Sequence, residues 1–243
     1  MELNIEKCKT ISYSRKREGN KVMYDYNISG VSISRCNLIN DLGIMLDNKL
    51  NMNAHIDYIT SKARQTLGFI KRQSKSFNDP YITRSLYCAL VRPTLEYCSI
   101  AWYPFTQQQI NKIESVQKQF LLFALRGLGW SNGFQLPAYE SRLLLLNMDS
   151  LEERRKVAGA TFMYKLMKDV VSVPNLKNVI VFNASNYNTR RRPLLTRSTH
   201  STSYGMNNPM NRFTMLVNEH SNVFMSSETV NVFKRQIRER IKN

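Results

Sequence analysis

The chain has 243 residues, with 35 Lys and Arg against 18 Asp and Glu, a formal net charge of +17. Hydrophobic residues make up 42% of it and charged residues 22%, which excludes a wholly disordered chain and a low-complexity linker. Its length fits one large or two small domains. The excess of positive charge favours contact with nucleic acid over a cationic surface that is merely solvated.

The positive charge is concentrated at the two ends of the chain. Residues 1–75 carry 13 basic and 7 acidic side chains, and residues 176–243 carry 11 and 3, whereas residues 131–175 carry 6 and 5. Basic ends around a nearly neutral, apolar middle predict a core in the middle and phosphate-facing surface at the ends.

Neither the cysteines nor the N-terminal residues indicate a special compartment. The four cysteines stand far apart with no histidine at ligand spacing, which suggests neither a zinc site nor a redox motif. The polar first residues and the lack of a long apolar run predict an intracellular protein, in the nucleus or the cytoplasm, with no membrane partner.

Period-two alternation predicts β structure in the first fifty residues. Residues 10–14 and 22–28 alternate, with a polar hairpin loop at 15–21 and a turn at Ser29 and Gly30. The segment Asp-Leu-Gly-Ile-Met-Leu-Asp at 41–47 predicts one further short apolar strand. Together these segments predict an antiparallel meander.

Three helices are predicted next, and they would form a small bundle. An apolar stripe runs from Ile56 to Ile70 at helical spacing. Asp79 and Pro80 are typical of a helix start, and that helix must end near Arg92 because Pro93 follows. A capping box indicates a third helix. The box consists of Thr106 and Gln109. Trp102, between two of these helices, is predicted to lie in the core.

Three further helical segments and one long loop are predicted in the rest of the chain. An apolar helical segment lies near 143–146, and Ser150 with Glu153 predicts a second capping box. Residues 183–211 are rich in Asn, Ser, Thr and Arg and predict a loop. A final amphipathic helix is predicted from about Glu228.

These elements predict an α+β fold, in which a short N-terminal antiparallel β-meander precedes a helical bundle and a helical C-terminal region. Four parts are expected, namely 1–53 for the strands, 54–127 for the bundle, 128–182 for a helical extension, and 183–243 for a basic loop and the last helix.

Several segments, in the same order and spacing, resemble the end of the reverse transcriptase of non-LTR (LINE, jockey-like) retrotransposons. The resemblance is strong to about residue 125 and weaker after it. The segments are Leu-Asn-Ile-Glu-Lys-Cys-Lys at 3–9, Ile-Ser-Tyr-Ser-Arg at 11–15, Tyr-Asn-Ile-Ser-Gly at 26–30, Asp-Leu-Gly-Ile-Met-Leu-Asp at 41–47, Leu-Gly-Phe-Ile-Lys-Arg at 67–72, Leu-Val-Arg-Pro-Thr-Leu-Glu-Tyr at 90–97, Ala-Trp-Tyr-Pro at 101–104 and Ile-Glu-Ser-Val-Gln-Lys-Gln-Phe at 113–120.

The resemblance implies the end of a polymerase palm (1–53), a thumb that grips the template–primer duplex (54–127) and a tail. In that family, clustered aspartates, including an adjacent pair in a Tyr-x-Asp-Asp turn, hold the Mg²⁺ ions of two-metal phosphoryl transfer. This chain has no Asp-Asp pair. We therefore expect a fragment of an RNA-directed DNA polymerase with no cofactor and no catalytic residue of its own, inactive alone. Its expected partners are RNA, RNA–DNA hybrid, and the missing palm and fingers.

Candidate nucleic-acid-binding residues come in four groups, three of them in the first part of the chain. The resemblance makes 41–47 a primer-grip hairpin with Gly43 at its turn, although an ordinary buried strand is the alternative. Two further candidates, Lys7 and Lys9, flank the first strand, where contact with phosphate and a solvated strand end are equally supported. The basic residues of the helix at 55–73 fit a thumb helix that follows a duplex backbone, against the alternative of a solvated face. They are Lys62, Arg64, Lys71 and Arg72.

The C-terminal candidates would bind RNA or act as a nuclear address. They are Arg190, Arg191, Arg192, Lys234, Arg235 and Arg238. The alternative function is a protein-interaction module, or a non-functional relic of a truncated retroelement, whose exposed apolar faces once met the missing domains.

Overall fold

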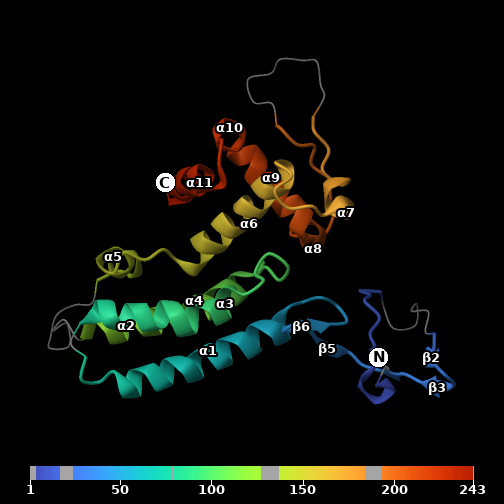
Figure 1. Ribbon diagram of the computed structural model, residues 1–243, viewed down its shortest axis with the longest axis horizontal. Coiled ribbons are helices and arrows are strands. Elements are labelled where there is room, and N and C mark those ends of the chain that lie inside the picture. Colours follow the sequence, from blue (N-terminus) through green and yellow to red (C-terminus); the bar gives the residue numbers. More distant parts are fainter. Residues whose placement is uncertain (1–3, 17–23, 78, 127–136, 184–192, 243) are drawn as a thin grey trace.

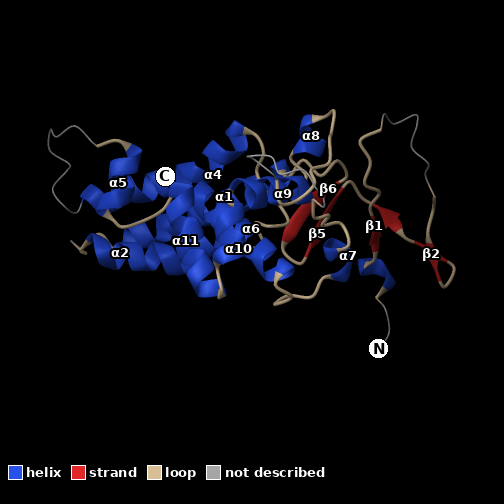
Figure 2. Cartoon of the chain, turned by 90° about the horizontal axis from the view of Figure 1, so that it is seen from above, coloured by secondary structure: helices blue, strands red, loops and turns tan. Residues whose placement is uncertain are grey.

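A computed structural model of the chain describes residues 4–16, 24–77, 79–126, 137–183 and 193–242. Short strands near the N-terminus are followed by a predominantly helical region (Figures 1 and 2), so the fold is α+β as predicted. The predicted hairpin loop at 15–21 falls partly outside the described residues.

Within the described part of the chain, the strands form three small pairs. One pair is parallel and the other two are antiparallel hairpins, so they do not form the continuous meander expected from the sequence. After the 3₁₀-helix η1 (Ile5–Lys7), the pairs are β1 (Lys9–Thr10) with β4 (Ser34–Arg35), β2 (Asn27–Ile28) with β3 (Val31–Ser32), and β5 (Leu38–Asp41) with β6 (Ile44–Asp47). The β2–β3 hairpin intervenes between β1 and β4, which allows β4 to return in the direction of β1.

The segment 41–47 is the turn and second strand of a hairpin, and the prediction of one strand across it was wrong. Leu42 and Gly43 occupy the turn between β5 and β6, with φ of 47° and 85°. Two successive positive φ angles are what a type I′ two-residue hairpin turn requires. The turn reverses the chain where the short apolar run alone indicated an extended strand.

Helix α1 (Asn53–Gln73) follows the hairpin and buries the predicted apolar stripe. Helix α2 (Pro80–Leu86) begins as predicted, because the Asp79 carboxylate accepts a hydrogen bond from the Tyr81 N–H at 2.7 Å. The helical path does not end near Arg92, however. It continues through the π-helix η3 (Tyr87–Val91) into α3 (Arg92–Glu96).

The π-helix explains why Pro93 does not end this helical path. The Arg92 N–H bonds to the Tyr87 carbonyl five residues earlier, and Pro93 then stands in the first turn of α3. Proline is tolerated there because its missing N–H has no partner to lose within the new helix. A single wide turn therefore restarts the helix at the position where the sequence predicts a stop.

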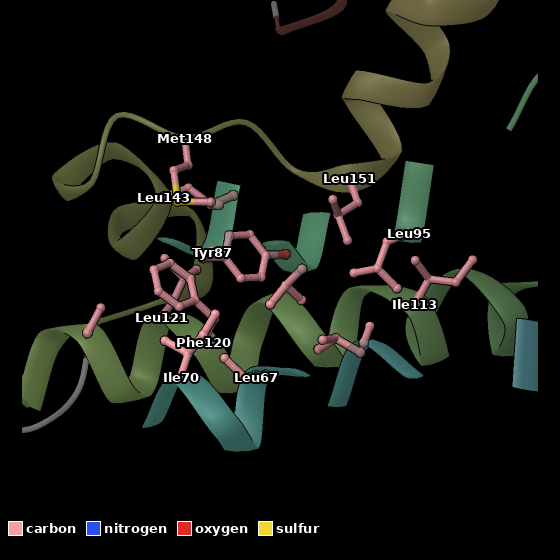
Figure 3. Packing of buried hydrophobic residues seen from close by; sticks show 14 of the residues in the cluster. Leu67, Ile70, Tyr87, Leu95, Ile113, Phe120, Leu121, Leu143, Met148 and Leu151 are labelled. Atoms are coloured by element: carbon pink, nitrogen blue, oxygen red, sulfur yellow. The ribbon is translucent and has the colours of Figure 1, made fainter. Parts of the chain in front are cut away.

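Helix α4 (Gln107–Arg126) packs along α1 and completes the first core cluster. Its capping box is formed as predicted, with the Gln109 N–H donating to the Thr106 hydroxyl at 3.2 Å. Tyr87 stacks on Phe120 with ring centres 4.2 Å apart (Figure 3). Trp102 is fully buried, which confirms its predicted place in the core.

A second core cluster is formed by helices that lie above α4 in the view of Figure 1. Helix α5 (Tyr139–Leu145) leads to α6 (Leu151–Met167), whose predicted capping box of Ser150 and Glu153 is present. The side chains of α6 pack against α9 (Pro209–Glu219) and α11 (Val230–Lys242), with α10 (Ser221–Ser226) beside them. Leu151 belongs to the first cluster and Ala160 to the second, so α6 joins them.

The prediction of a loop over 183–211 was wrong for its last third. Helix α7 (Pro174–Lys177) precedes this region, and α8 (Ser203–Met206) and the first turn of α9 lie within it. The side chains of Thr202 and Asn208 cap these two helices. Polar composition hid the helices because the same Ser, Thr and Asn residues that are typical of loops are also the preferred N-caps.

Candidate nucleic-acid interface

One flank of α1 combines exposed aromatic and basic side chains. Tyr58 and Phe69 are 45% and 53% exposed, and Lys62 and Arg72 are exposed beside them. Spacings of four, seven and three residues place these four on one stripe of the helix. We call this set, Tyr58, Lys62, Phe69 and Arg72, the α1 stripe. Helix α1 lies at the outer edge of the fold (Figure 1).

The other two predicted residues of this helix, Arg64 and Lys71, lie on the opposite flank beside α4. The Arg64 guanidinium donates to the Ser115 hydroxyl at 2.8 Å, and the Lys71 ammonium lies 5.9 Å from the centre of the Phe123 ring. Burial and the charge of Arg126 lower the pKa of Lys71. Contacts with α4 therefore hold both residues, and they are less free than the α1 stripe to meet a ligand.

The hairpin with Gly43 at its turn is fixed at the N-terminal end of α1. The Tyr97 hydroxyl donates to the Leu42 carbonyl at 3.1 Å, and the Met45 N–H donates to Nδ1 of His55 at 3.3 Å. Burial lowers the pKa of His55 to about 4, so its ring is neutral at pH 7. The turn projects Leu42, which is 84% exposed. These hydrogen bonds thus attach the hairpin firmly to α1 and to the end of α3.

Two of the remaining predicted residues, Lys7 and Lys9, belong to other elements than the hairpin and α1. Lys7 and Lys9 are exposed at the end of η1 and in β1. The predicted cluster of Arg190, Arg191 and Arg192 lies outside the described residues. These residues are therefore not included in the α1 stripe.

Lys234, Arg235 and Arg238 line a cleft of about 630 Å³ between α6 and α11. Asp149 is nearly buried in it, and its carboxylate lies 2.6 Å from the Arg238 guanidinium and 2.5 Å from the Lys242 ammonium. Burial raises the pKa of Asp149, but these two cations outweigh burial and lower it. Arg238 is thus engaged in a structural ion pair. Helix α11 packs on α6, so this group does not extend the α1 stripe.

A second cleft, which the sequence did not reveal, lies between α6 and α9 and contains Arg155 and Arg212. Arg155 is 3% exposed although it stands in the run Glu-Glu-Arg-Arg-Lys at 152–156, a composition typical of a solvated helix face. The only clue in the sequence is position, because Arg155 is four residues from Leu151 and Gly159, which are both buried.

Within the described residues, His, Cys, Asp and Glu side chains do not gather into a group that could hold a metal ion. No described helix is both long and apolar enough to cross a membrane. Cations can pair with phosphate, and exposed rings can stack on bases or sugars.

Comparison with known proteins adds one relative. An uncharacterized protein of Caenorhabditis elegans is 28% identical over 123 residues, which cover 49% of this chain and 58% of that protein. The matched part therefore spans less than two thirds of the relative's length. No family model and no solved structure matches the chain.

Proposed function

We propose that this chain is the C-terminal part of a non-LTR retrotransposon reverse transcriptase, comprising the end of the palm, the thumb and the tail. In this proposal it binds an RNA–DNA hybrid through the α1 stripe and catalyses no polymerisation alone. The observation that carries the proposal is the α1 stripe itself, where two cations and two aromatic rings lie exposed on a helix anchored by a buried core.

The composition of the α1 stripe suits a nucleic-acid backbone. Lysine and arginine contribute sequence-independent affinity through phosphate, and this affinity falls with salt. Exposed tyrosine and phenylalanine otherwise cost solvation, and packing against the sugars or the unpaired ends of a hybrid would offset that cost. The supported hairpin beside α1 agrees with a primer grip next to a thumb helix.

The test is fluorescence anisotropy of a labelled RNA–DNA hybrid at several salt concentrations. We expect binding that weakens linearly on a logarithmic salt axis, and a double variant, Lys62→Gln with Arg72→Gln, should reduce the slope by about 1 for each lost phosphate contact. The control removes two exposed cations elsewhere, Lys168→Gln with Arg240→Gln, and should change the slope less.

Two outcomes would overturn the proposal. One is a lack of salt-dependent affinity at low ionic strength, and the other is an equal loss of affinity in the control. Primer extension with Mg²⁺ tests the second part of the proposal, because any extension by this chain would contradict catalytic silence.

A second candidate function, protein interaction, is favoured by a different surface. Ile82, Leu90 and Tyr97 are 47%, 49% and 58% exposed along α2, η3 and the end of α3, and Leu42 adjoins Tyr97 at the hairpin turn. Contiguous exposed apolar side chains are typical of interaction surfaces. Light scattering after size exclusion separates the two functions. Self-association that depends on concentration, without affinity for the hybrid, would favour this candidate.

A further inference from the structure

A small cleft lies where α6, α9 and the segment after α3 meet. It has a volume of about 240 Å³. Gly159 on α6 allows the close approach of α9, because a Cβ atom there would lie 3.2 Å from the Phe213 ring. Ile100 and Leu216 add apolar wall, and two arginines, Arg155 and Arg212, supply positive charge.

Arg155 is the unusual member of this cleft. Its side chain is almost completely buried, yet among the described residues no group accepts a hydrogen bond from its Nε or from either of its terminal nitrogens. Burial lowers the pKa of Arg155, but a guanidinium keeps its charge at neutral pH. A buried charge without hydrogen bonds is costly, so an anion in the cleft would remove a real penalty.

Two of the carboxylates around Arg155 are engaged elsewhere. Glu152 pairs with Lys156 at 2.9 Å, and Glu96 pairs with Arg154. Glu114 is closest in electrostatic effect, but its Oε1 accepts hydrogen bonds from the Tyr139 hydroxyl and from the Leu151 N–H. Its Oε2 has no hydrogen-bond partner in the described part of the chain, so compensation of Arg155 by Glu114 through space is the rival explanation.

Arg212 brings a second guanidinium to the same cleft. Its Cζ lies 4.0 Å from the centre of the Tyr103 ring, and its Nε donates to the Asn207 carbonyl at 3.0 Å. Burial lowers the pKa of Arg212 to about 10, which still leaves it charged at pH 7. The stacked ring and the backbone hydrogen bond hold the guanidinium in place. The N–H groups of its two terminal nitrogens can still donate hydrogen bonds to a ligand.

We propose that the cleft between α6 and α9 binds a phosphate group, whose oxygens accept hydrogen bonds from Arg155 and Arg212. Two guanidinium groups present more donors than a carboxylate can accept, whereas a phosphate offers three or four oxygens and up to two negative charges. Glu219 at the edge of the cleft and the ion-paired Lys156 leave an excess of positive charge. The apolar wall leaves room for a small group attached to the phosphate. This site is independent of the α1 stripe.

The test measures the affinity of the intact chain for inorganic phosphate by isothermal titration calorimetry, at constant ionic strength and with acetate as the carboxylate comparison. Arg155→Met should weaken phosphate binding at least about tenfold, because charge-assisted hydrogen bonds are lost. Arg212→Gln, at the less buried side of the cleft, is the second variant and should weaken binding similarly. Arg240→Gln, an exposed arginine on α11, is the matched control and should bind phosphate as the unmodified chain does.

The melting temperature without phosphate distinguishes the proposal from its rival. If the buried charge of Arg155 is uncompensated without an anion, Arg155→Met should raise the melting temperature. If Glu114 compensates that charge, the same substitution should lower the melting temperature. Binding of acetate as strong as that of phosphate, or phosphate binding that survives in both cleft variants, would overturn the proposal.

The source of the phosphate is identified by two further ligands. Adenosine monophosphate represents a free phosphate monoester, and a short single-stranded oligonucleotide represents the nucleic-acid backbone. Stronger binding of the first indicates a nucleotide-like ligand, and stronger binding of the second indicates a backbone phosphate. In either case, Arg155→Met must weaken binding of that ligand as it weakens binding of inorganic phosphate, or the result does not support the site.

Discussion

The imidazole of His55 meets the indole of Trp102 edge to face, with ring centres 4.7 Å apart, at the start of α1. Trp102 is fully buried and its Nε1 donates to the Tyr97 carbonyl at 2.6 Å. His55 accepts from the Met45 N–H of β6. One buried pair therefore connects the hairpin, α1 and the segment that follows α3.

Stability should fall as His55 becomes protonated. Its pKa is about 4 in the folded chain, whereas the ordinary value of an exposed histidine, expected in the unfolded chain, is 6.5. The unfolded chain thus binds more protons between these values, and the free energy of unfolding should decrease by up to about 1.4 kcal/mol per pH unit as the pH falls from 6.5 towards 4. Urea unfolding at several pH values measures this slope. His55→Gln should flatten it. An unchanged slope in His55→Gln would refute the assignment.

Asp149 should stabilise the attachment of α11. Replacing it in Asp149→Asn leaves Arg238 and Lys242 without their carboxylate, but both cations are roughly half exposed, so the cost should be about 1–2 kcal/mol. The lowered pKa of Asp149 means that its contribution is present at neutral pH and is lost as the pH falls through the folded value.

Chemical denaturation of two asparagine variants provides the comparison for Asp149. Asp169 also pairs with a lysine, Lys177, but both side chains are at least half exposed. Asp169→Asn should therefore cost less than about 0.5 kcal/mol. Equal effects of the two substitutions would show that burial of Asp149 has no energetic consequence.

Leu42 stands in a backbone conformation that suits asparagine better than leucine. Its φ is 47°, and a branched apolar side chain gains nothing at a position that is 84% exposed. Leu42→Asn should raise the free energy of unfolding by about 0.5–1 kcal/mol. Leu38→Asn, in the extended strand β5, should give no gain. If Leu42 contributes to the apolar surface shared with Tyr97, the same variant should also reduce any self-association measured by light scattering.

Local patterns predicted much of the helical part of this fold. The apolar stripe of α1, the Asp79 cap and both capping boxes depend on residues within a few positions of each other, and all are present. The helix through Pro93 was missed because a π-turn depends on packing rather than on composition. Helices α8 and α9 were missed because their caps resemble loop residues.

The candidate sites were less predictable because exposure depends on tertiary packing. Charge and spacing identified the basic residues of α1, but only the position of α4 separates Lys62 from Arg64. Arg155 was hidden in a charged run because nothing in that run indicates which side of α6 meets α9. The aromatic members of the α1 stripe, Tyr58 and Phe69, were missed because exposed rings cannot be distinguished from core rings in a sequence.

Helix α6 determines how the chain can be divided for experiments. Leu151 completes the cluster around α1 and α4, while Ala160, Met163 and Leu166 complete the cluster around α9 and α11. A fragment that ends before α6 would open the first cluster, and a fragment that ends just after α6 would leave half of its surface uncovered in water. Shortened versions that keep only one cluster are therefore poor reagents, and surface substitutions in the full chain are the better route to its partners.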